Sequence, residues 1–419
     1  MAEKAPAPKG SPAAAPKAAP KAAPAAAPAA APRGTPSAGR PTGAPGGKLF
    51  DYKAVLQNMI QNNASDLHLK VGRPPTLRVD GQMISLESEP LKQEDLRSLA
   101  EQIMAPKNIK EFSELKESDF ALAVPGIGRF RVNAYQQRGT IAYAFRTVPF
   151  QAKTIQELNL PAACERIAMM PRGLVLVTGI TGSGKSTALA SMLHFINQNR
   201  QANVITIEDP IEYLHRDIKC SINQREVGTD TGSFGQALRR VLRQDPDVIL
   251  VGEIRDLETL DTALKAAETG HLVFSTLHTT DATQTINRIL SFYPPHQQTE
   301  VRYMLSNALR AVISLRLVKR TDKKGRVPAA EILVNSEAVR DQMRDLSKAL
   351  NLPQLIREGA VPYGMQSFDQ SIMNWYEKGV ISYEDALQAS TNPSEFALRV
   401  QGVAASSDTS WDTFQQDVT

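Results

Sequence analysis

The segment Gly179–Ser186 constrains the fold of this 419-residue chain more than any other feature, because it fits the pattern G-x-x-x-x-G-K-[S/T]. An apolar run, Leu174–Thr178, precedes it, and a segment of helical period follows it. In such a unit the glycines turn backbone N–H groups around a β-phosphate, Lys185 reaches the β- and γ-phosphates, and Ser186 binds Mg²⁺. The pattern therefore predicts binding of ATP and Mg²⁺ by Gly179, Thr181, Gly182, Ser183, Gly184, Lys185, Ser186 and Thr187. A glycine-rich turn without a ligand is the alternative.

Three further apolar runs follow this loop, at Val204–Ile207, Val248–Val251 and Leu272–Thr276, and segments of helical period separate them. Continuous apolar strands of this length are typical of a mostly parallel sheet that is buried on both faces. The sequence thus predicts an α/β fold. One expected helix buries Leu189, Met192, Leu193 and Ile196, and another, after Asp256, buries Leu257, Leu260, Leu264 and Ala267. The region from Val301 to about Val400 is expected to be mainly helical.

Carboxylates follow two of these runs. Glu253 lies at the carboxyl end of the third run, where nucleotides bind in open α/β sheets, and it is predicted to hold Mg²⁺ or to polarise the attacking water. The segment Glu208-Asp209-Pro210-Ile211-Glu212 ends the second run, and Glu208 or Glu212 is predicted to orient water or metal. A helix-capping Glu253 and a charged surface turn at 208–212 are the alternatives.

Two histidines, His271 and His278, bracket the fourth run. They are candidates for sensing the γ-phosphate or for a relay across a subunit interface, although isolated histidines are more often structural. A zinc site is not expected, because the chain has only two cysteines, Cys164 and Cys220, and no further His at ligand spacing. The low cysteine count also favours a reducing cytosol over a disulfide-bonded protein.

The region 49–148 has the pattern of a small mixed α/β domain. A helix is expected at Tyr52–Asn62, and strands at Thr76–Val79 and Ile141–Arg146. Between them Phe130, Val132 and Ala134 alternate with polar residues, so a strand there would bury this set and present Arg129 and Arg131 on its other face.

Residues 1–48 are rich in Ala, Pro and Lys, with proline at every fourth position from Pro8 to Pro36. No helix tolerates that spacing, so a disordered arm is predicted, and the evenly placed lysines leave no apolar core for a signal peptide. The arm carries a net charge of +6 and the rest of the chain −2, so no nucleic-acid partner is expected. The remaining predicted divisions are a linker at 149–165, an ATPase domain at 166–402 and a flexible tail at 403–419.

Four motifs occur together in one order: the phosphate loop, Ile207–Glu212, Leu250–Asp256 and Thr269–Thr279. With Ala64–His68 and Gly128–Asn133 in the first domain, the chain resembles the secretion-superfamily hexameric ATPases from about Leu49 to Val400. It is most similar to the PilT-like retraction motors of type IV pili. The resemblance implies a PAS-like N-terminal domain and a RecA-like ATPase domain in a homo-hexamer, with nucleotide between the two domains.

The resemblance also implies roles for single residues. Glu212 matches the last glutamate of an acidic motif and is the expected activator of water, with Glu253 supporting Mg²⁺ and the γ-phosphate. The family's first-domain arginines, which reach the phosphates, match Arg129, Arg131 and Arg146. A histidine motif of the family matches His271 and His278.

The absence of a four-cysteine zinc module, typical of pilus-extension and secretion ATPases, favours the retraction branch. The implied function is an ATPase that drives pilus depolymerisation and twitching motility from the cytoplasm at the inner-membrane base of the pilus. Its implied partners are an inner-membrane platform protein and a paralogous retraction ATPase, and its contact with the membrane would be peripheral only. Residues 364–370 and 382–387 also resemble PilU-like accessory ATPases, which gives the nearest alternative. A nucleic-acid translocase is the alternative from another class.

Overall fold

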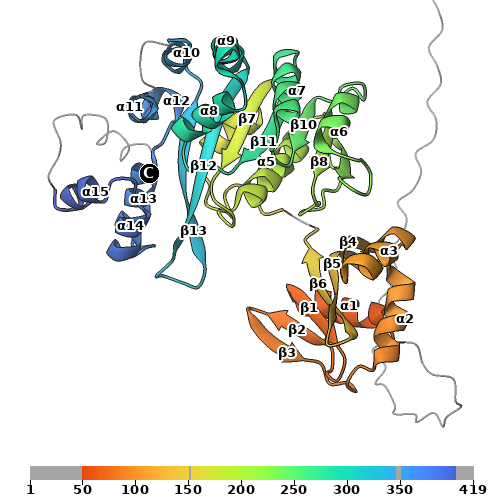
Figure 1. Cartoon of the computed structure of the whole chain (residues 1–419). Coiled ribbons are helices and arrows are strands. Elements are labelled where there is room, and N and C mark those ends of the chain that lie inside the picture. Colours follow the sequence, from red (N-terminus) through yellow and green to blue (C-terminus); the bar gives the residue numbers. More distant parts are fainter. Residues whose placement is uncertain (1–49, 151, 346–350, 403–419) are drawn as a thin grey trace, which may run out of the picture. The chain divides into compact units, whose positions relative to one another are not determined.

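The computed structural model describes residues 50–150, 152–345 and 351–402 (Figure 1). The predicted arm at 1–48 and tail at 403–419 lie outside the described residues. No helix in the described ranges combines the length and apolarity that crossing a bilayer requires.

Residues 50–148 form a six-stranded sheet in which every neighbouring pair is antiparallel, in the order β3-β2-β1-β6-β5-β4 (Figure 1). The strands are β1 (Asp66–Lys70), β2 (Thr76–Val79), β3 (Gln82–Ser85), β4 (Glu117–Val124), β5 (Gly128–Gln137) and β6 (Thr140–Val148). The helices are α1 (Tyr52–Gln61), α2 (Gln93–Ile103) and α3 (Pro106–Leu115).

Strand β5 shows why the alternating pattern predicted a strand. Phe130, Val132 and Ala134 are buried, with exposed fractions of 0%, 1% and 0%, and they join one hydrophobic cluster. Arg129 and Arg131 lie between them on the other face and are half-buried. The period of two therefore predicted both the strand and its buried face.

The second sheet has seven strands in the order β13-β12-β7-β11-β10-β8-β9. They are β7 (Gly173–Thr178), β8 (Asn203–Glu208), β9 (Ser221–Glu226), β10 (Val248–Val251), β11 (Leu272–Leu277), β12 (Leu309–Lys319) and β13 (Arg326–Val334). All neighbours are parallel except β12 and β13. The four apolar runs form β7, β8, β10 and β11, which confirms the predicted parallel sheet.

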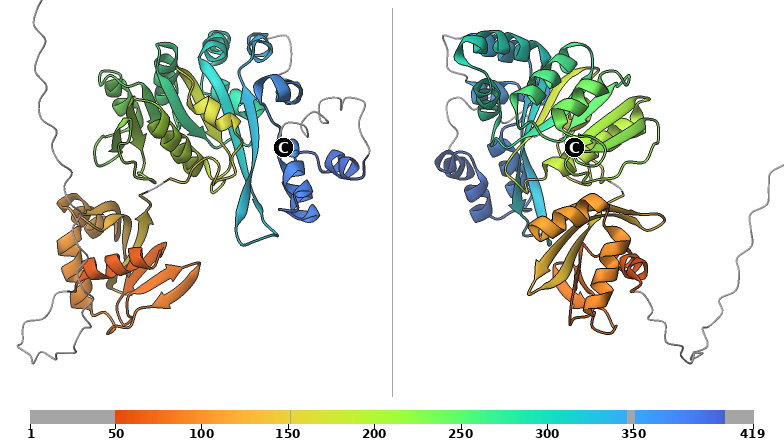
Figure 2. Two further views of the ribbon diagram at one scale, coloured as in Figure 1. Left: turned by 180° about the vertical axis from the view of Figure 1, so that it is seen from behind. Right: turned by 45° about the vertical axis from the view of Figure 1, so that its right-hand side comes forward.

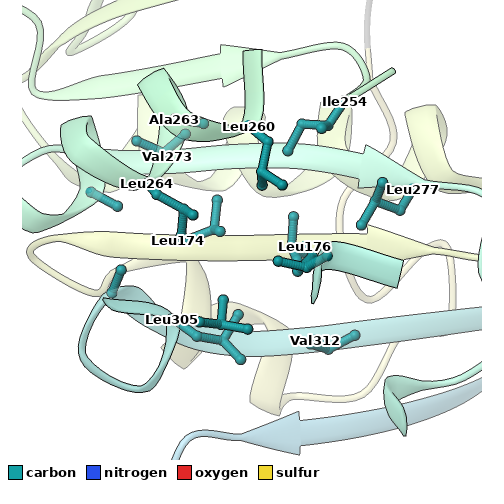
Figure 3. Packing of buried hydrophobic residues seen from close by; sticks show 14 of the residues in the cluster. Leu174, Leu176, Ile254, Leu260, Ala263, Leu264, Val273, Leu277, Leu305 and Val312 are labelled. Carbon is teal, nitrogen blue, oxygen red and sulfur yellow. The ribbon is translucent and has the colours of Figure 1, made fainter. Parts of the chain in front are cut away.

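Helices cover both faces of this sheet. They are α4 (Ala163–Ala168), α5 (Lys185–Asn199), α6 (Phe234–Val241), α7 (Leu257–Glu268), α8 (Ala282–Ser291), the short η1 (Pro295–Gln297) and α9 (Gln298–Ala308). Leu174 and Leu176 of β7 pack against α7, where Leu260 and Leu264 are buried (Figure 3). Alternate residues of β7 belong to a second cluster with α4 and α5. Because both faces are covered, every side chain of β7 is apolar except the terminal Thr178.

The region predicted to be mainly helical, Val301–Val400, begins in α9 but then contains two strands that the prediction did not include. Strands β12 and β13 occupy 309–334 and extend beyond their neighbours (Figure 1; Figure 2, left). Arg310 and Arg316 interrupt the apolar run of β12, so its local period does not indicate a strand, whereas pairing with β7 on one side and β13 on the other does. The helices expected in this region follow: α10 (Glu337–Arg344), α11 (Leu352–Glu358), α12 (Ala360–Tyr363), α13 (Phe368–Glu377), α14 (Tyr383–Ala389) and α15 (Pro393–Val400).

The sheet brings the predicted motifs to one edge. Strands β7, β8, β10 and β11 are parallel and adjacent, so their carboxyl ends lie together. The loop Gly179–Gly184 follows β7, and Glu253 and His278 follow β10 and β11. A single edge of the sheet therefore carries the candidate site.

Candidate functional site

The loop after β7 has a backbone that only glycine adopts easily. Gly179, Gly182 and Gly184 have φ angles of +142°, +78° and +95°. A Cβ at Gly179 would lie 2.4 Å from Ser183 Oγ and 2.6 Å from the Leu315 carbonyl oxygen, so this position also needs the small residue for space. Helix α5 then begins at Lys185 with no side chain capping its first N–H groups. These donors are available to an anion at the helix N-terminus.

The side chain of Lys185 folds back over this loop. Its Nζ donates to the carbonyl oxygens of Gly179, at 2.8 Å, and Ile180, at 3.0 Å. Burial lowers the pKa of Lys185, and the nearby charges of Glu253 and Glu212 act in the opposite direction. The buried hydroxyl of Ser183 has no hydrogen-bond partner within the described residues. A buried ammonium held only by carbonyls and an orphaned buried hydroxyl fit a triphosphate that supplies the missing acceptors.

Glu208 ends β8 and turns inward. Its Oε1 accepts from Thr206 Oγ1 at 2.6 Å and from Gln224 Nε2 at 3.1 Å. Burial raises the pKa of Glu208, and hydrogen bonds from Thr206, Gln224 and the backbone amide of Glu212 oppose that rise. The structure therefore holds Oε1 of Glu208 with two side-chain donors of the protein.

Glu212 and Asp209 are exposed on the same segment. Glu212 lines the pocket described below, and its charge acts on Lys185. Asp209 pairs with Arg255 at 3.5 Å, and the peptide bond between Asp209 and Pro210 is cis. All three carboxylates of the motif line the pocket, but Glu208 is bonded by Thr206 and Gln224 and Asp209 is paired with Arg255.

Glu253 lies directly after β10 and is half-buried. Its carboxylate pairs with the guanidinium of Arg255 and lies 3.4 Å from His278 Nε2. Hydrogen bonding to Glu253 is the largest cause of the raised pKa of Arg255. The end of β10 thus carries a carboxylate held between a permanent cation and an imidazole, facing the phosphate loop.

The structure separates the two predicted histidines. His278 is exposed and lines the pocket beside Glu253. His271 lies at the opposite end of β11, roughly 20 Å away along the strand, where its Nδ1 is 2.9 Å from the Ala266 carbonyl oxygen. Only His278 meets the other candidate residues in this chain.

None of the predicted arginines lines the pocket. Arg129 pairs with Glu226 at 2.9 Å, and Arg146 pairs with Asp66 at 2.9 Å. Arg131 lies on β5, two residues after Arg129, and is paired in register with Arg146 of β6. The structure places all three on one strand pair and brings none of them to the phosphate loop.

A pocket of about 530 Å³ joins the loop to the carboxylates. Residues that the sequence analysis missed also line it: Tyr213, His215, Arg255, Leu317 and Arg326. Leu317 and Arg326 come from β12 and β13, the hairpin that local period did not indicate. Tyr213 bonds Thr187 of α5, with the two hydroxyl oxygens 3.0 Å apart, and burial lowers the pKa of His215 to about 4. Tyr213 adjoins the motif Ile207–Glu212 and Arg255 lies within the motif Leu250–Asp256, so their place in the sequence was the one signal available for them.

The residues present also fit Mg²⁺. No cluster of three or more His, Cys, Asp or Glu side chains suited to a metal occurs in the part of the chain that the structure describes. Mg²⁺ does not need one, because it keeps several waters and takes its other ligands from phosphates and one or two side chains. Ser186 and Glu253 line the same pocket and provide a hydroxyl and a carboxylate for that purpose.

Comparison with known proteins agrees with this geometry. The model of the family described as "Type II/IV secretion system protein" matches residues 47–352. The type IV pilus retractation ATPase PilT of Pseudomonas aeruginosa is 46% identical over 83% of this chain and 100% of its own length. A twitching motility protein of Neisseria gonorrhoeae is 44% identical over 77% of this chain and 86% of its own length.

The type IV pilus ATPase PilU of Pseudomonas aeruginosa is 39% identical over 84% of this chain and 91% of its own length. Among solved structures, the pilus retraction motor PilT with bound ADP has a TM-score of 0.75 and 44% identity, covering 81% of this chain and 97% of that one. These likenesses confirm the RecA-like fold expected for the ATPase part. The chain therefore belongs to the type II/IV secretion system protein family, as an ATPase of its PilT-like group.

Proposed function

We propose that this chain is the ATP-hydrolysing motor of type IV pilus retraction. One observation carries the proposal: the 46% identity to a pilus retractation ATPase extends over that protein's full length. The pocket supports it, since the phosphate loop, Glu212, Glu253 and His278 line one cavity. Hydrolysis of ATP would supply the free energy for pilin depolymerisation.

The position of each residue in the pocket suggests its role in hydrolysis. Lys185 and the N-terminus of α5 neutralise charge on the phosphates, and Glu212 accepts a proton from the attacking water. Ser186 and Glu253 would hold Mg²⁺, which supplies charge neutralisation at the β- and γ-phosphate oxygens when bound. His278 orients the Glu253 carboxylate, from which its Nε2 is 3.4 Å distant.

The predicted arginines of the first domain can contact a bound nucleotide only after a movement of that domain or from another subunit. Arg129, Arg131 and Arg146 lie outside the pocket and would reach a phosphate only if their domain shifts or if a neighbouring subunit presents them. We propose a homo-hexamer in which such shifts are coupled to hydrolysis. We further propose a cytoplasmic location at the inner-membrane base of the pilus, with a platform protein as partner.

An accessory function is the second candidate, because the chain is also 39% identical to PilU over 84% of its length. An accessory ATPase would act through a paralogous motor. The two functions differ in what the chain does alone, which makes them separable by experiment.

The test combines turnover with motility. Full-length protein is run on a sizing column, its Mg²⁺-dependent ATPase rate is measured, and wild type is compared with Glu212→Ala and Glu253→Ala. The same genes are introduced into a strain that lacks its retraction ATPase. We expect turnover in a hexamer-sized peak, its loss in both variants, and restored twitching with wild type only.

Other results would change the assignment. Restoration of twitching only when a paralogous retraction ATPase is present would support the accessory function. Stimulation of turnover by single-stranded DNA, with a steep dependence on salt, would instead favour nucleic-acid translocation.

A further inference from the structure

Strand β9 lies at the edge of the sheet and runs beside the acidic segment that follows β8. It pairs with β8 in parallel register from Asn203–Ser221 to Glu208–Glu226. Gln224 and Glu226, two residues apart on β9, both bond residues of this segment. Neither side chain belongs to the pocket lining, so their contacts need an explanation apart from substrate binding.

Both the amide nitrogen and the amide oxygen of Gln224 form hydrogen bonds with residues between Glu208 and His215. Its Nε2 donates to Glu208 Oε1 at 3.1 Å and to the Tyr213 carbonyl oxygen at 2.8 Å. Its Oε1 accepts from the His215 backbone N–H at 2.9 Å. One half-buried side chain therefore joins Glu208, before Glu212, to Tyr213 and His215, after it.

Glu208 lies four residues before Glu212 on this segment. Its carboxylate accepts from Gln224 Nε2 at 3.1 Å. On the far side of this segment, Glu226 Oε2 accepts from the Ile211 backbone N–H at 3.1 Å. The backbone on both sides of Glu212 is thus held by residues of β9, since Glu226 bonds Ile211 before it and Gln224 bonds Tyr213 after it.

We propose that Gln224 is a positioning residue for hydrolysis, which sets where the Glu212 carboxylate lies relative to the phosphate loop. The inference rests on the proposed function, in which Glu212 activates water. Positioning matters here because a displacement of about 1 Å at a reacting group costs roughly 100-fold in rate. Gln224 is joined to Glu212 only through the backbone of its neighbour Tyr213, so it acts without touching the substrate.

The proposal predicts a particular kinetic result. Gln224 makes no hydrogen bond to Lys185, Ser186 or the loop glycines, so nucleotide affinity does not depend on it. Removal of its amide therefore lowers kcat and leaves KM for ATP within about twofold. A purely structural defect of the pocket would change both.

The experiment measures Mg²⁺-dependent turnover and ADP affinity of the full-length chain carrying Gln224→Met, a substitution of similar shape without donor or acceptor. Asn223→Ala is the matched control, since its exposed side chain bonds Asn203 Oδ1, on β8, at 3.2 Å and no residue of the acidic segment. We expect kcat to fall roughly 10- to 100-fold in Gln224→Met, with ADP affinity and thermal midpoint near those of the control.

A second variant and a double mutant sharpen the test. Gln224→Glu keeps an acceptor for His215 but places a second carboxylate beside Glu208, so its kcat is expected to fall at least as far. In a Glu212→Gln background, Gln224→Met is expected to cause less than a twofold further loss, because the two act as one unit.

Three outcomes overturn the inference separately from the proposed function. Wild-type kcat in Gln224→Met while Glu212→Gln is inactive would reject Gln224 alone. Equal losses in kcat and ADP affinity would show a general defect of the pocket. An active Glu212→Gln would remove the proposed role of Glu212, and the positioning role would fall with it.

Discussion

The Nε2 atom of His278 lies 3.4 Å from the Oε2 atom of Glu253, which joins the carboxyl ends of two neighbouring parallel strands. His278 thus contacts a carboxylate of the candidate site. His271 lies at the other end of β11, and its partner is a backbone carbonyl. The two histidines bracket one strand in the sequence, yet the structure gives them different surroundings.

The first prediction follows from this difference. His278→Gln is expected to lower kcat about two- to fivefold, because it weakens a half-exposed contact to a charged group, of a kind worth roughly 0.2–1 kcal/mol. His271→Gln serves as the matched control and is expected to change turnover of the isolated chain less than twofold. Steady-state ATPase rates of the two variants decide the question, and equal losses would contradict it.

The second prediction concerns Lys185. Lys185→Ala is expected to reduce turnover below detection while the fold persists, because the ammonium meets phosphate and its two present partners are backbone carbonyls of the loop, outside the hydrophobic core clusters. Circular dichroism and a thermal melt test the fold, and a phosphate-release assay tests turnover. Wild-type rates in this variant would reject the assignment of the loop.

The third prediction concerns Gly179, where an added Cβ would lack space, and compares it with a glycine where the only cost is backbone strain. Gly179→Ala places a Cβ 2.4 Å from Ser183 Oγ, at a φ of +142°, so nucleotide affinity is expected to fall at least tenfold (about 1.4 kcal/mol). Gly72→Ala is the control, since Gly72 has a φ of +78° but nothing within 4 Å of the added Cβ. The control is expected to lose about 1 kcal/mol of stability with unchanged ADP affinity, as measured by titration calorimetry.

The fourth prediction concerns stability against pH. Burial raises the pKa of Glu331 from 4.5 to about 7, assisted by Asp281 and Asp369 and opposed by Arg316. Between these two pH values the folded chain binds more protons than the unfolded chain, so this contribution is full below pH 4.5 and is lost as pH rises through 7. The loss amounts to about 3 kcal/mol.

Glu331→Gln is expected to remove this component while keeping an oxygen to accept the Ala282 N–H, which Glu331 Oε1 now accepts at 2.8 Å. The measurement is urea unfolding of wild type and variant from pH 5 to pH 8. Glu337→Gln is the control, because the Glu337 side chain is 68% exposed. An unchanged pH slope in Glu331→Gln would contradict the prediction.

Local sequence determined much of the fold because its signals are short-range. The apolar runs of β7, β8, β10 and β11 predicted a mostly parallel sheet, and period two predicted the buried face of β5. The phosphate loop was recognisable because glycines, Lys185 and Ser186 are needed at fixed spacing within eight residues. In each case the physical constraint acts on neighbours in the chain.

Tertiary structure decided what depends on distant residues. The interrupted run of β12 became a strand because β7 and β13 pair with it, and this pairing brings Leu317 and Arg326 to the pocket. Glu208 and Glu212 stand four residues apart in one acidic motif and both line the pocket, but Gln224 of β9 bonds Glu208, whereas Glu212 is exposed. Residue type and spacing therefore determined which chemistry the chain can carry, whereas hydrogen bonds and burial between separate strands decided which of these carboxylates is bonded within the protein and which is exposed.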